Sequence, residues 1–340
     1  MLRFEGSIPV YALDAPCHMS KNGGRLVIEM EDGGRQSIPL LQVRSIAAGP
    51  RSQMTTQLIF ALLRQETPVF YVDRQWRISG TVGLGSAALW RLERQMACFC
   101  DSEQQMAFAK ETIQTKLLRQ RQVLLQYGKR VNSFCLADAV QKLSACAAMT
   151  GSARTVDTLM GIEGTGARAY FGAFSALLDD SLWHWKGRRQ RRAQDPVNAL
   201  LNYGYAFLEG EVRVAAAASG LDGRIGFLHA NNGRKDSLIY DLMELFRAEV
   251  TDRFVLTLLR RGTFMPSHFE RHREGIRLTK EAALLWAERY ERYMERSYQS
   301  LGGLAPRAWI RKEIERSAAE CFGTGRVLIE NAKRKKSEEA

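Results

Sequence analysis

The 340-residue sequence contains no long apolar segment and no recognisable export signal. Its apolar runs stay below the roughly 18 residues that a helix needs to cross a bilayer, and no predicted helix is uniformly basic on its polar face. The opening stretch, MLRFEGSIPVYAL, carries Glu5 and Pro9 where a signal peptide has an unbroken apolar core. We therefore expect a cytoplasmic protein without a membrane partner.

Several motifs that mark an activity are missing too. The sequence has no G-x-x-x-x-G-K-[S/T] loop, which excludes a P-loop ATPase, and no G-x-S-x-G turn of the kind that presents a catalytic serine. Its six cysteines are scattered, and the closest pair, Cys98 and Cys100, has a spacing that common zinc modules do not use. We predict reduced core thiols at positions 17, 98, 100, 135, 146 and 321.

Acidic residues are fewer than basic ones. Against 49 Lys and Arg there are 37 Asp and Glu, which leaves a formal charge of +12. An excess of this size favours a polyanionic partner, and nucleic acid is the first candidate. The 45% hydrophobic and 25% charged residues are ordinary for a globular protein, and the length predicts two domains.

The residue pattern of the chain changes from strand-like to helical near residue 83. Before it, RLVIEM, EDGG and RQSIPL predict a strand, a turn and a second strand, TPVFYVD and QWRISG predict another pair, and one short helix is expected near residues 52 to 65. After it, long stretches of Leu, Ala, Gln, Arg and Glu have helical spacing, and Thr279 is the predicted N-cap of the clearest helix. The prediction is a β domain at 1–82, a hinge at 83–88, a helical domain at 89–330 and a charged tail at 331–340.

Two short motifs match functional sites only in part. GLGSAA, at residues 83–88, fits a dinucleotide-binding fingerprint, but helical texture follows where the fingerprint requires a second parallel strand, so a linker is the favoured interpretation. HFERH places His268 and His272 at a spacing that can bind zinc from one helix face, but Glu270 is not where zinc proteases have their glutamate. We interpret this segment as an exposed basic stretch available to phosphate.

Three segments carry polar groups that core packing does not require. MGIEGTGARAYFGAF places Glu163 between glycines at the start of a helix. GRIGFLHANNGRKDSLIYDLMELFR places His229 after an apolar strand-like or helical run, and then Asp241 and Glu244 on adjacent turns of one helix. Between them lies WHWKGRRQRRAQDPVNALLNYGY, with five basic residues in seven positions: Lys186, Arg188, Arg189, Arg191 and Arg192.

A carboxylate, an imidazole and a second carboxylate can hold one divalent ion if the fold gathers them. With basic residues beside them, a phosphodiester is the natural substrate, and the ion would act as a Lewis acid on a phosphoryl oxygen. An imidazole ligand suits Mn²⁺ better than Mg²⁺, although Mg²⁺ is the commoner cellular ion. Spacing alone leaves open the alternative that these are surface groups or satisfied core groups.

The ordered combination of GIEGTGARAYF, DPVNALLNYGY, FLH and YDLMELFR resembles the Cas1 family of CRISPR-associated spacer-acquisition integrases, over essentially the whole chain. The resemblance implies a small β-sandwich domain joined to a larger all-α catalytic domain. It implies a metal-dependent DNA endonuclease and integrase that inserts short foreign DNA fragments into a CRISPR array, by attack of a fragment's 3′-hydroxyl on a repeat phosphodiester. The implied partners are double-stranded DNA, a second copy through the β domains, and the small protein Cas2.

By motif, the resemblance assigns the metal ligands to Glu163, His229 and Glu244, with Mn²⁺ or Mg²⁺ as the ion. Glu244 stands where many relatives have Asp, and Leu245 where they often have Pro. Asp241 would then orient His229 or a metal-bound water. Further DNA contacts are predicted within the motifs, with packing, capping or salt-bridge roles as the alternative, at Tyr170, Asn198, Ser237 and Arg247.

Alternatives remain for the acids and for the whole protein. In one, Asp241 pairs with a basic residue such as Arg247 while Glu244 faces solvent. In another, the protein is a non-catalytic DNA-binding subunit of a nucleoprotein assembly, whose acids serve only in salt bridges. A nicotinamide enzyme is a third, and it would need to bind its cofactor through Gly83 and Gly85.

Overall fold

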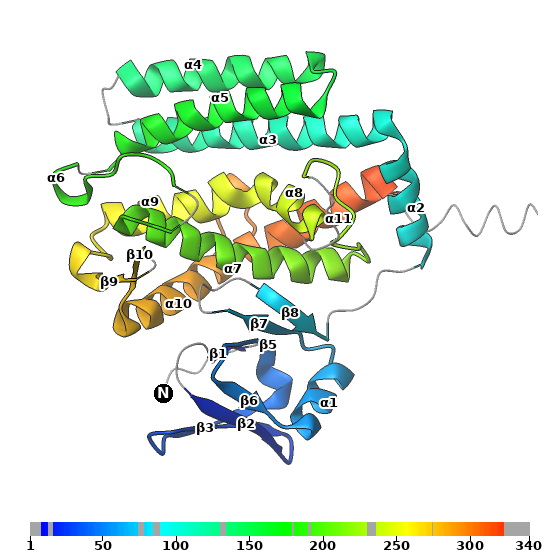
Figure 1. Ribbon diagram of the computed structural model, residues 1–340, viewed down its shortest axis with the longest axis vertical. Helices are drawn as coiled ribbons and strands as arrows, with labels where there is room; N and C mark the ends of the chain where they lie inside the picture. Colours follow the sequence, from blue (N-terminus) through cyan, green and yellow to red (C-terminus); the bar gives the residue numbers. More distant parts are fainter. Residues whose placement is uncertain are drawn as a thin grey trace, which may run out of the picture. The chain divides into compact units, whose positions relative to one another are not determined.

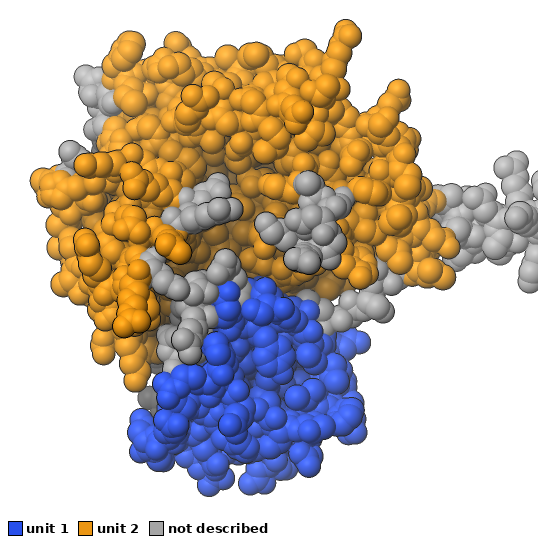
Figure 2. All heavy atoms as spheres, viewed as in Figure 1, with its two compact units in different colours: residues 1–86 blue, residues 87–340 orange. Residues whose placement is uncertain are grey.

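The computed structural model describes residues 8–12, 16–73, 78–83, 89–129, 134–178, 180–189, 192–229, 236–273 and 275–322. The chain forms two compact units, Met1–Ser86 and Ala87–Ala340, which have separate colours in Figure 2. The division falls within the predicted hinge at 83–88, of which residues 84–88 lie outside the described residues, as does the predicted tail at 331–340. Strands dominate the first unit and helices the second, which confirms the predicted two-domain α+β fold class.

The first unit contains eight described strands and one α-helix (Figure 1). They are β1 (Ile8–Ala12), β2 (Cys17–Asn22), β3 (Arg25–Met30), β4 (Arg35–Pro39), β5 (Val43–Ala48), β6 (Ser52–Met54), α1 (Thr56–Arg64), β7 (Val69–Val72) and β8 (Ile78–Val82), with a 3₁₀ turn η1 (Leu40–Gln42). One sheet has the order β1-β5-β7-β8 and the other β4-β3-β2-β6. Met19 and Leu26 of the second sheet and Ile46 and Val69 of the first are fully buried in one shared core, as in a β-sandwich.

Both predicted strand pairs are present in this unit. Strands β3 and β4 pair antiparallel across a turn in which Asp32 Oδ1 accepts a hydrogen bond from Gly34 N at 2.9 Å, and Gly33 has a φ of 81° that favours glycine. Strands β7 and β8 also pair antiparallel. The predicted helix near 52 to 65 begins later than expected, because residues 52–54 form β6 beside β2 and Thr55 caps α1 through Leu58 N.

The second unit is mainly helical (Figure 1). Helices α3, α4 and α5 pack against one another, and α7 packs against α8 and α11. Helix α8 continues without a break through a π-helical turn, η3, into α9. The helices are α2 (Leu89–Cys100), α3 (Ser102–Gly128), α4 (Phe134–Met149), α5 (Val156–Ser175), α6 (Asp180–Trp183), α7 (Pro196–Ala218), α8 (Ser237–Phe246), η3 (Arg247–Asp252), α9 (Arg253–Arg260), α10 (Lys280–Glu295) and α11 (Pro306–Phe322), with 3₁₀ turns η2 (Thr150–Ser152), η4 (Pro266–His268) and η5 (Gln299–Leu301).

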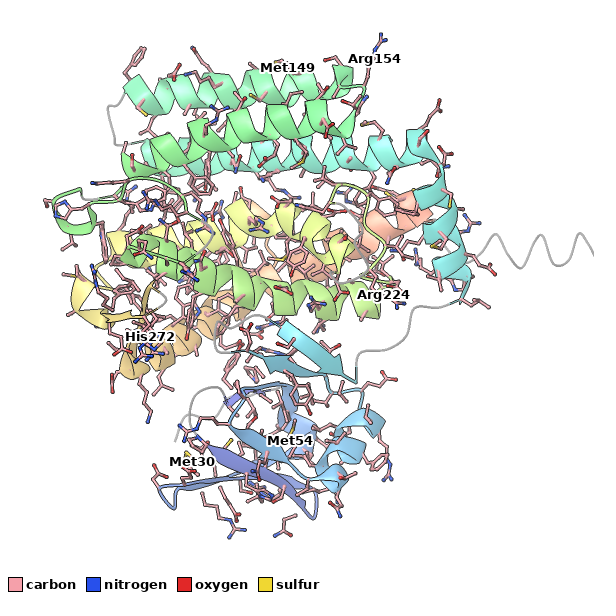
Figure 3. All side chains as sticks on the ribbon, viewed as in Figure 1. Met30, Met54, Met149, Arg154, Arg224 and His272 are labelled. Atoms are coloured by element: carbon pink, nitrogen blue, oxygen red, sulfur yellow. The ribbon has the colours of Figure 1, made fainter. Side chains whose placement is uncertain are left out.

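An antiparallel strand pair, β9 (Phe269–His272) and β10 (Gly275–Leu278), interrupts the described part of this unit, so the predicted all-α domain is not wholly helical. Gly275 has a φ of 136°, and a Cβ there would lie 2.4 Å from the carbonyl oxygen of Ala193, so only glycine lets the two backbones meet. His272, labelled in Figure 3, belongs to β9. The helix face that would have joined His268 and His272 is therefore absent.

The helix caps follow the sequence closely. Thr279 accepts a hydrogen bond from Ala282 N at 3.2 Å and caps α10, as predicted. Asp195 accepts one from Asn198 N at 2.8 Å at the start of α7. Thr155 caps α5, so Glu163 lies inside that helix. The sequence-based prediction that Glu163 stands at the start of a helix is therefore wrong.

The structure also bears on three other expectations, which concern the cysteines, a membrane-spanning helix and a nicotinamide enzyme. All six cysteines are free, and Cys17, Cys98 and Cys146 are buried, but Cys100 and Cys135 lie on exposed faces of α2 and α4, so the prediction of core thiols is wrong for these two. No helix among the described residues is long and apolar enough to span a bilayer. Strand β8 before Gly83 is antiparallel to β7 and is followed by α2, which is not the βαβ unit that a nicotinamide enzyme requires.

Candidate active site

Three helices of the second unit bring the predicted acids to one place. Helix α5 carries Glu163, α8 carries Asp241 and Glu244, and α3 packs against both of these helices. The close approach of α3 to α5 depends on Gly166, because a Cβ there would lie 2.2 Å from Leu117 Cδ2. This packing brings the side chain before Leu117 between the two acidic helices.

That side chain is Lys116, whose ammonium group bridges the two predicted carboxylate ligands. Its Nζ lies 2.5 Å from Glu163 Oε1 and 2.6 Å from Glu244 Oε2. The three side chains are mostly buried, with exposed fractions of 11% for Lys116, 16% for Glu163 and 8% for Glu244. The fold therefore gathers the two acids around a single positive charge.

The other oxygen of Glu244 faces a second cation. Arg247 Nε lies 3.1 Å from Glu244 Oε1. Burial alone would raise the pKa of Glu244, but Arg247 and Lys116 outweigh it and lower that pKa to about 2. Burial would lower the pKa of Lys116, but Glu244 and Glu163 raise it above its usual value. Glu244 is thus a carboxylate, and Lys116 an ammonium, at neutral pH.

His229 is held beside this pair by Asp241. The imidazole Nδ1 lies 2.6 Å from Asp241 Oδ1, and this hydrogen bond, against the opposing effect of burial, raises the pKa of His229. Such a contact is the one an orienting carboxylate makes, and it leaves Nε2 as the nitrogen available to a ligand. Since Arg247 pairs with Glu244 and Glu244 is buried, the alternative in which Asp241 pairs with Arg247 and Glu244 faces solvent is wrong.

The loop before His229 is shaped by the same carboxylate. Asp241 is fully buried, and its oxygens accept hydrogen bonds from the backbone nitrogens of residues 227, 228 and 229 at 2.6, 3.0 and 3.0 Å. Residues 227–229 form bends, not the strand-like or helical run expected from the sequence. Ser237 is 1% exposed and packs against Gly226, where a Cβ would come within 2.5 Å of Ser237 Cβ, so it presents no surface to DNA.

The basic run before α7 is divided between surface and interior. Lys186, Arg189 and Arg192 are exposed, and Arg191 lies outside the described residues. Arg188 points inward and donates hydrogen bonds to the side-chain oxygens of Asn198 at 2.9 Å and Asn202 at 2.8 Å. Its guanidinium carbon also lies 5.2 Å from the ring centroid of Tyr205.

Asn198 fixes the backbone of this basic loop. It is fully buried, its oxygen accepts a hydrogen bond from Arg189 N at 2.8 Å, and its nitrogen donates to the carbonyl of Gly187 at 2.9 Å. A buried side chain of this kind does not contact DNA itself. It holds the exposed basic residues in one arrangement instead.

Tyr170 and Asp252 form a second buried group next to the site. The hydroxyls of Tyr170 and Tyr205 donate to the two oxygens of Asp252 at 3.0 and 2.6 Å. Burial raises the pKa of Asp252 to about 6, although both tyrosine hydrogen bonds oppose the shift. Tyr170 is fully buried, so its contacts are those of a packing residue.

Sequence reasoning missed Lys116, Tyr205 and Asp252. A signal for Lys116 was present, because it stands on the face of α3 that also carries the buried residues Ile113, Leu117 and Gln120. A lysine at such a position needs an acidic partner. Tyr205 ends the DPVNALLNYGY motif, but nothing in that motif distinguishes it from a packing residue, and no pattern marks Asp252.

The donor set suits a divalent ion in its chemistry, and Lys116 occupies the place between the two carboxylates. No three His, Cys, Asp or Glu side chains among the described residues stand close enough together to share an ion. The ammonium of Lys116 is already a cation at the oxygens that an ion would use, and Glu244 Oε2 receives no well-directed hydrogen bond from the described residues. Two carboxylates and an imidazole match the ligand preferences of Mn²⁺ and Mg²⁺.

The chain is similar to known proteins over most of its length. Residues 10–292 match the profile of the family described as CRISPR associated protein Cas1. The chain belongs to the Cas1 family. A relative named CRISPR-associated endonuclease Cas1 1, from Thermus thermophilus, is 33% identical over 324 residues, which cover 91% of this chain and 96% of the relative.

Solved structures of similar fold extend the comparison. A casposase bound to an integration product has a TM-score of 0.78 at 24% identity, over 93% of this chain and 90% of the casposase. A chain from a Cas6-RT-Cas1–Cas2 complex also has a TM-score of 0.78, at 20% identity, over 94% of this chain and 35% of that longer one. At these identities the likeness shows the fold of the family.

Proposed function

We propose that this protein is a divalent-metal-dependent DNA endonuclease and integrase. It would insert short foreign DNA fragments into a CRISPR array through attack of a fragment's 3′-hydroxyl on a repeat phosphodiester. The observation that carries the proposal is the convergence of Glu163 and Glu244 on one cation, with Asp241, on the same helix as Glu244, holding His229.

Glu163, Glu244 and His229 Nε2 would hold Mn²⁺ or Mg²⁺. When bound, the ion would polarise a phosphoryl oxygen and lower the pKa of the attacking hydroxyl or water, which is worth several kcal/mol of barrier. Asp241 fixes the tautomer and direction of His229 through the 2.6 Å contact at Nδ1. Arg247 neutralises the second oxygen of Glu244.

DNA would bind through phosphate contacts of the basic loop. Lys186, Arg189 and Arg192 are its exposed cations, and Asn198 and Arg188 hold its backbone in place. Phosphate contacts of this kind position a duplex without reading its sequence. The formal charge of +12 supports a polyanionic partner.

We also propose a homodimer formed through the first unit, a larger complex with Cas2, and a cytoplasmic location. The family resemblance supports these assignments. The same fold in a complex that contains Cas2 supports the Cas2 partner.

One observation favours a second candidate function. The ion pairs of Lys116 with Glu163 and Glu244 are those expected of a non-catalytic DNA-binding subunit whose acids serve in salt bridges. The two functions differ in one property, because only the enzyme cleaves branched DNA when Mn²⁺ is added and stops when EDTA removes it.

Two neighbouring acids on α8 provide the sharper test. We expect Glu244→Gln to abolish cleavage and strand transfer at every Mn²⁺ concentration, because it removes a ligand. Asp241→Asn should retain activity reduced by about 10 to 100-fold, and higher Mn²⁺ should partly restore it, because it changes the group that positions His229 and its loop but leaves all three proposed ligands in place. Glu288→Gln, at an exposed ion pair with Arg292 on α10, is the matched control and should keep wild-type activity.

The measurement is the rate of cleavage and strand transfer on fluorescent branched DNA across a Mn²⁺ titration, with DNA affinity measured in parallel. Affinity should stay within a few-fold for all three variants, since binding depends on Lys and Arg contacts with phosphate. An active Glu244→Gln beside an inactive Asp241→Asn would reverse the assignment of ligand and orienting group. Cleavage that persists in EDTA would refute metal dependence.

A further inference from the structure

Lys116 forms ion pairs with Glu163 and Glu244, and it is the one member of these two ion pairs to which the proposed chemistry gives no role. It reaches from α3 to touch both Glu163 and Glu244, at 2.5 and 2.6 Å. Arg247 meanwhile holds the other oxygen of Glu244 at 3.1 Å. The two acids that would bind an ion are therefore already neutralised by groups of the chain itself.

The ammonium and a divalent ion compete for the same carboxylates, because Lys116 and Arg247 already contact both oxygens of Glu244. An ion such as Mg²⁺ holds carboxylate oxygens at about 2.1 Å, so it would stand between Glu163 and Glu244 where Nζ now lies. Two cations cannot share that position. Contact of Lys116 with both carboxylates and binding of an ion by both carboxylates are thus mutually exclusive.

The net charge of the site differs between the metal-free and the metal-bound state. Lys116 and Arg247 pair with Glu163 and Glu244, and Asp241 pairs with His229, so with His229 neutral these side chains sum to one negative charge. A dication added while Lys116 stays protonated nearby reverses that sign. The site would then change from repelling a phosphodiester to attracting one.

We propose that Lys116 is the resident counter-ion of this site, which holds Glu163 and Glu244 together in the metal-free protein and is displaced when a divalent ion binds. This inference rests on the proposed function, since it assumes that these acids bind an ion. Lys116 is a positioning residue in this account. It keeps two buried carboxylates from repelling each other, and it makes the ion compete for its ligands.

Removal of the competing charge should strengthen ion binding. We expect Lys116→Met to bind Mn²⁺ about tenfold more tightly than the wild type, or tighter still, in DNA-free protein at pH 7.5. Lys110→Met is the matched control, because Lys110 is a half-buried lysine of the same helix whose ammonium donates to the Gly151 carbonyl at 3.0 Å. It removes the same charge and should change the affinity by less than about twofold. Isothermal titration calorimetry or the Mn²⁺ electron paramagnetic resonance signal gives the affinity.

Melting temperature is the second readout. In EDTA, Lys116→Met leaves two buried carboxylates without their shared cation, so it should melt about 5 °C below the wild type. Saturating Mn²⁺ replaces that cation and should close the gap. A lysine with a purely structural role would leave the same gap in EDTA and in Mn²⁺.

Lys116→Gln, which keeps a hydrogen-bond donor but no charge, covers the case in which Lys116→Met does not fold. Tighter Mn²⁺ binding by either variant, with a gap in melting temperature that Mn²⁺ closes, supports the inference. Unchanged or weaker binding by a folded variant overturns it and leaves the metal site intact. Absence of Mn²⁺ binding in the wild type and in both variants overturns the proposed function as well, and this result is distinct from the previous one.

Discussion

A methyl group added at Gly166 tests the packing that builds the site. In Gly166→Ala the new Cβ would lie 2.2 Å from Leu117 Cδ2 and 3.5 Å from Leu143 Cδ2. Carbon atoms prefer separations of about 3.5 to 4.0 Å, so Leu117 or the helix that carries it must move by more than about 1 Å. Both leucines are fully buried, which leaves little room for that movement.

Overpacking of this kind costs about 1 to 3 kcal/mol, while the better helix propensity of alanine returns up to about 1 kcal/mol. We expect a net loss of about 1 to 2 kcal/mol. At about 2 to 4 °C per kcal/mol for a unit of this size, the melting temperature should fall by about 2 to 8 °C. Circular dichroism melts of the full-length protein measure it.

Gly172→Ala is the matched control on the same helix. No atom lies within 4 Å of a Cβ at Gly172, so the substitution should gain up to about 1 kcal/mol from helix propensity alone. In a Leu117→Ala background, the methyl group of Gly166→Ala should fill the space that the leucine leaves and become stabilising. A Gly166→Ala variant that melts at or above the wild-type temperature would refute the close approach of α3 and α5.

Three more predictions concern the buried acid Asp252 and the basic loop. The pKa of Asp252, raised to about 6 from 3.8, means that the folded protein holds this proton more tightly than the unfolded chain, so the stabilisation is complete below about pH 4 and is lost as the pH rises through 6. Between pH 5 and 7.5 the melting temperature of the wild type should therefore fall relative to that of Asp252→Asn, and a relative rise would contradict the sign. Arg189→Gln should reduce the salt slope of DNA binding by about one and leave the melting temperature unchanged, because Arg189 is exposed. Arg188→Gln should lower the melting temperature, since it loses the contacts with Asn198 and Asn202, and an unchanged melt would show that Arg188 is only a surface cation.

Local chemistry explains why much of the fold could be predicted. The N-cap at Thr279 and the turn after Met30 depend on residues within four positions of one another, so the sequence displays them directly. The change from strand texture to helix texture near residue 83 is equally local, and it predicted the two-unit architecture. The helix predicted near 52 to 65 began late because residues 52–54 pair with β2, and that partner is more than thirty positions away.

The candidate site, too, could be predicted only in part. The motifs were sufficient to select Glu163, His229 and Glu244, but not to show that Lys116 lies between two of them, because Lys116 is 47 positions before Glu163 and belongs to none of those motifs. The inward turn of Arg188 was hidden for a similar reason. It depends on Asn198 and Asn202, which stand one turn apart on a helix that starts after the basic run ends.

The π-helical turn η3 connects the two halves of this arrangement. It begins at Arg247, which pairs with Glu244 and lies 4.7 Å from the ring centroid of Tyr205, and it ends at Asp252, which accepts the hydroxyl of that same ring. The ring also contacts Arg188, which anchors the basic loop. One tyrosine therefore touches the cation beside Glu244, a proposed metal ligand, the cation that anchors the proposed DNA-binding loop, and the buried carboxylate of Asp252. A π-turn is costly and often marks a functional position, and here it sets Arg247 and Asp252 against one ring. The geometry of the acids and the position of the basic loop thus both depend on Tyr205.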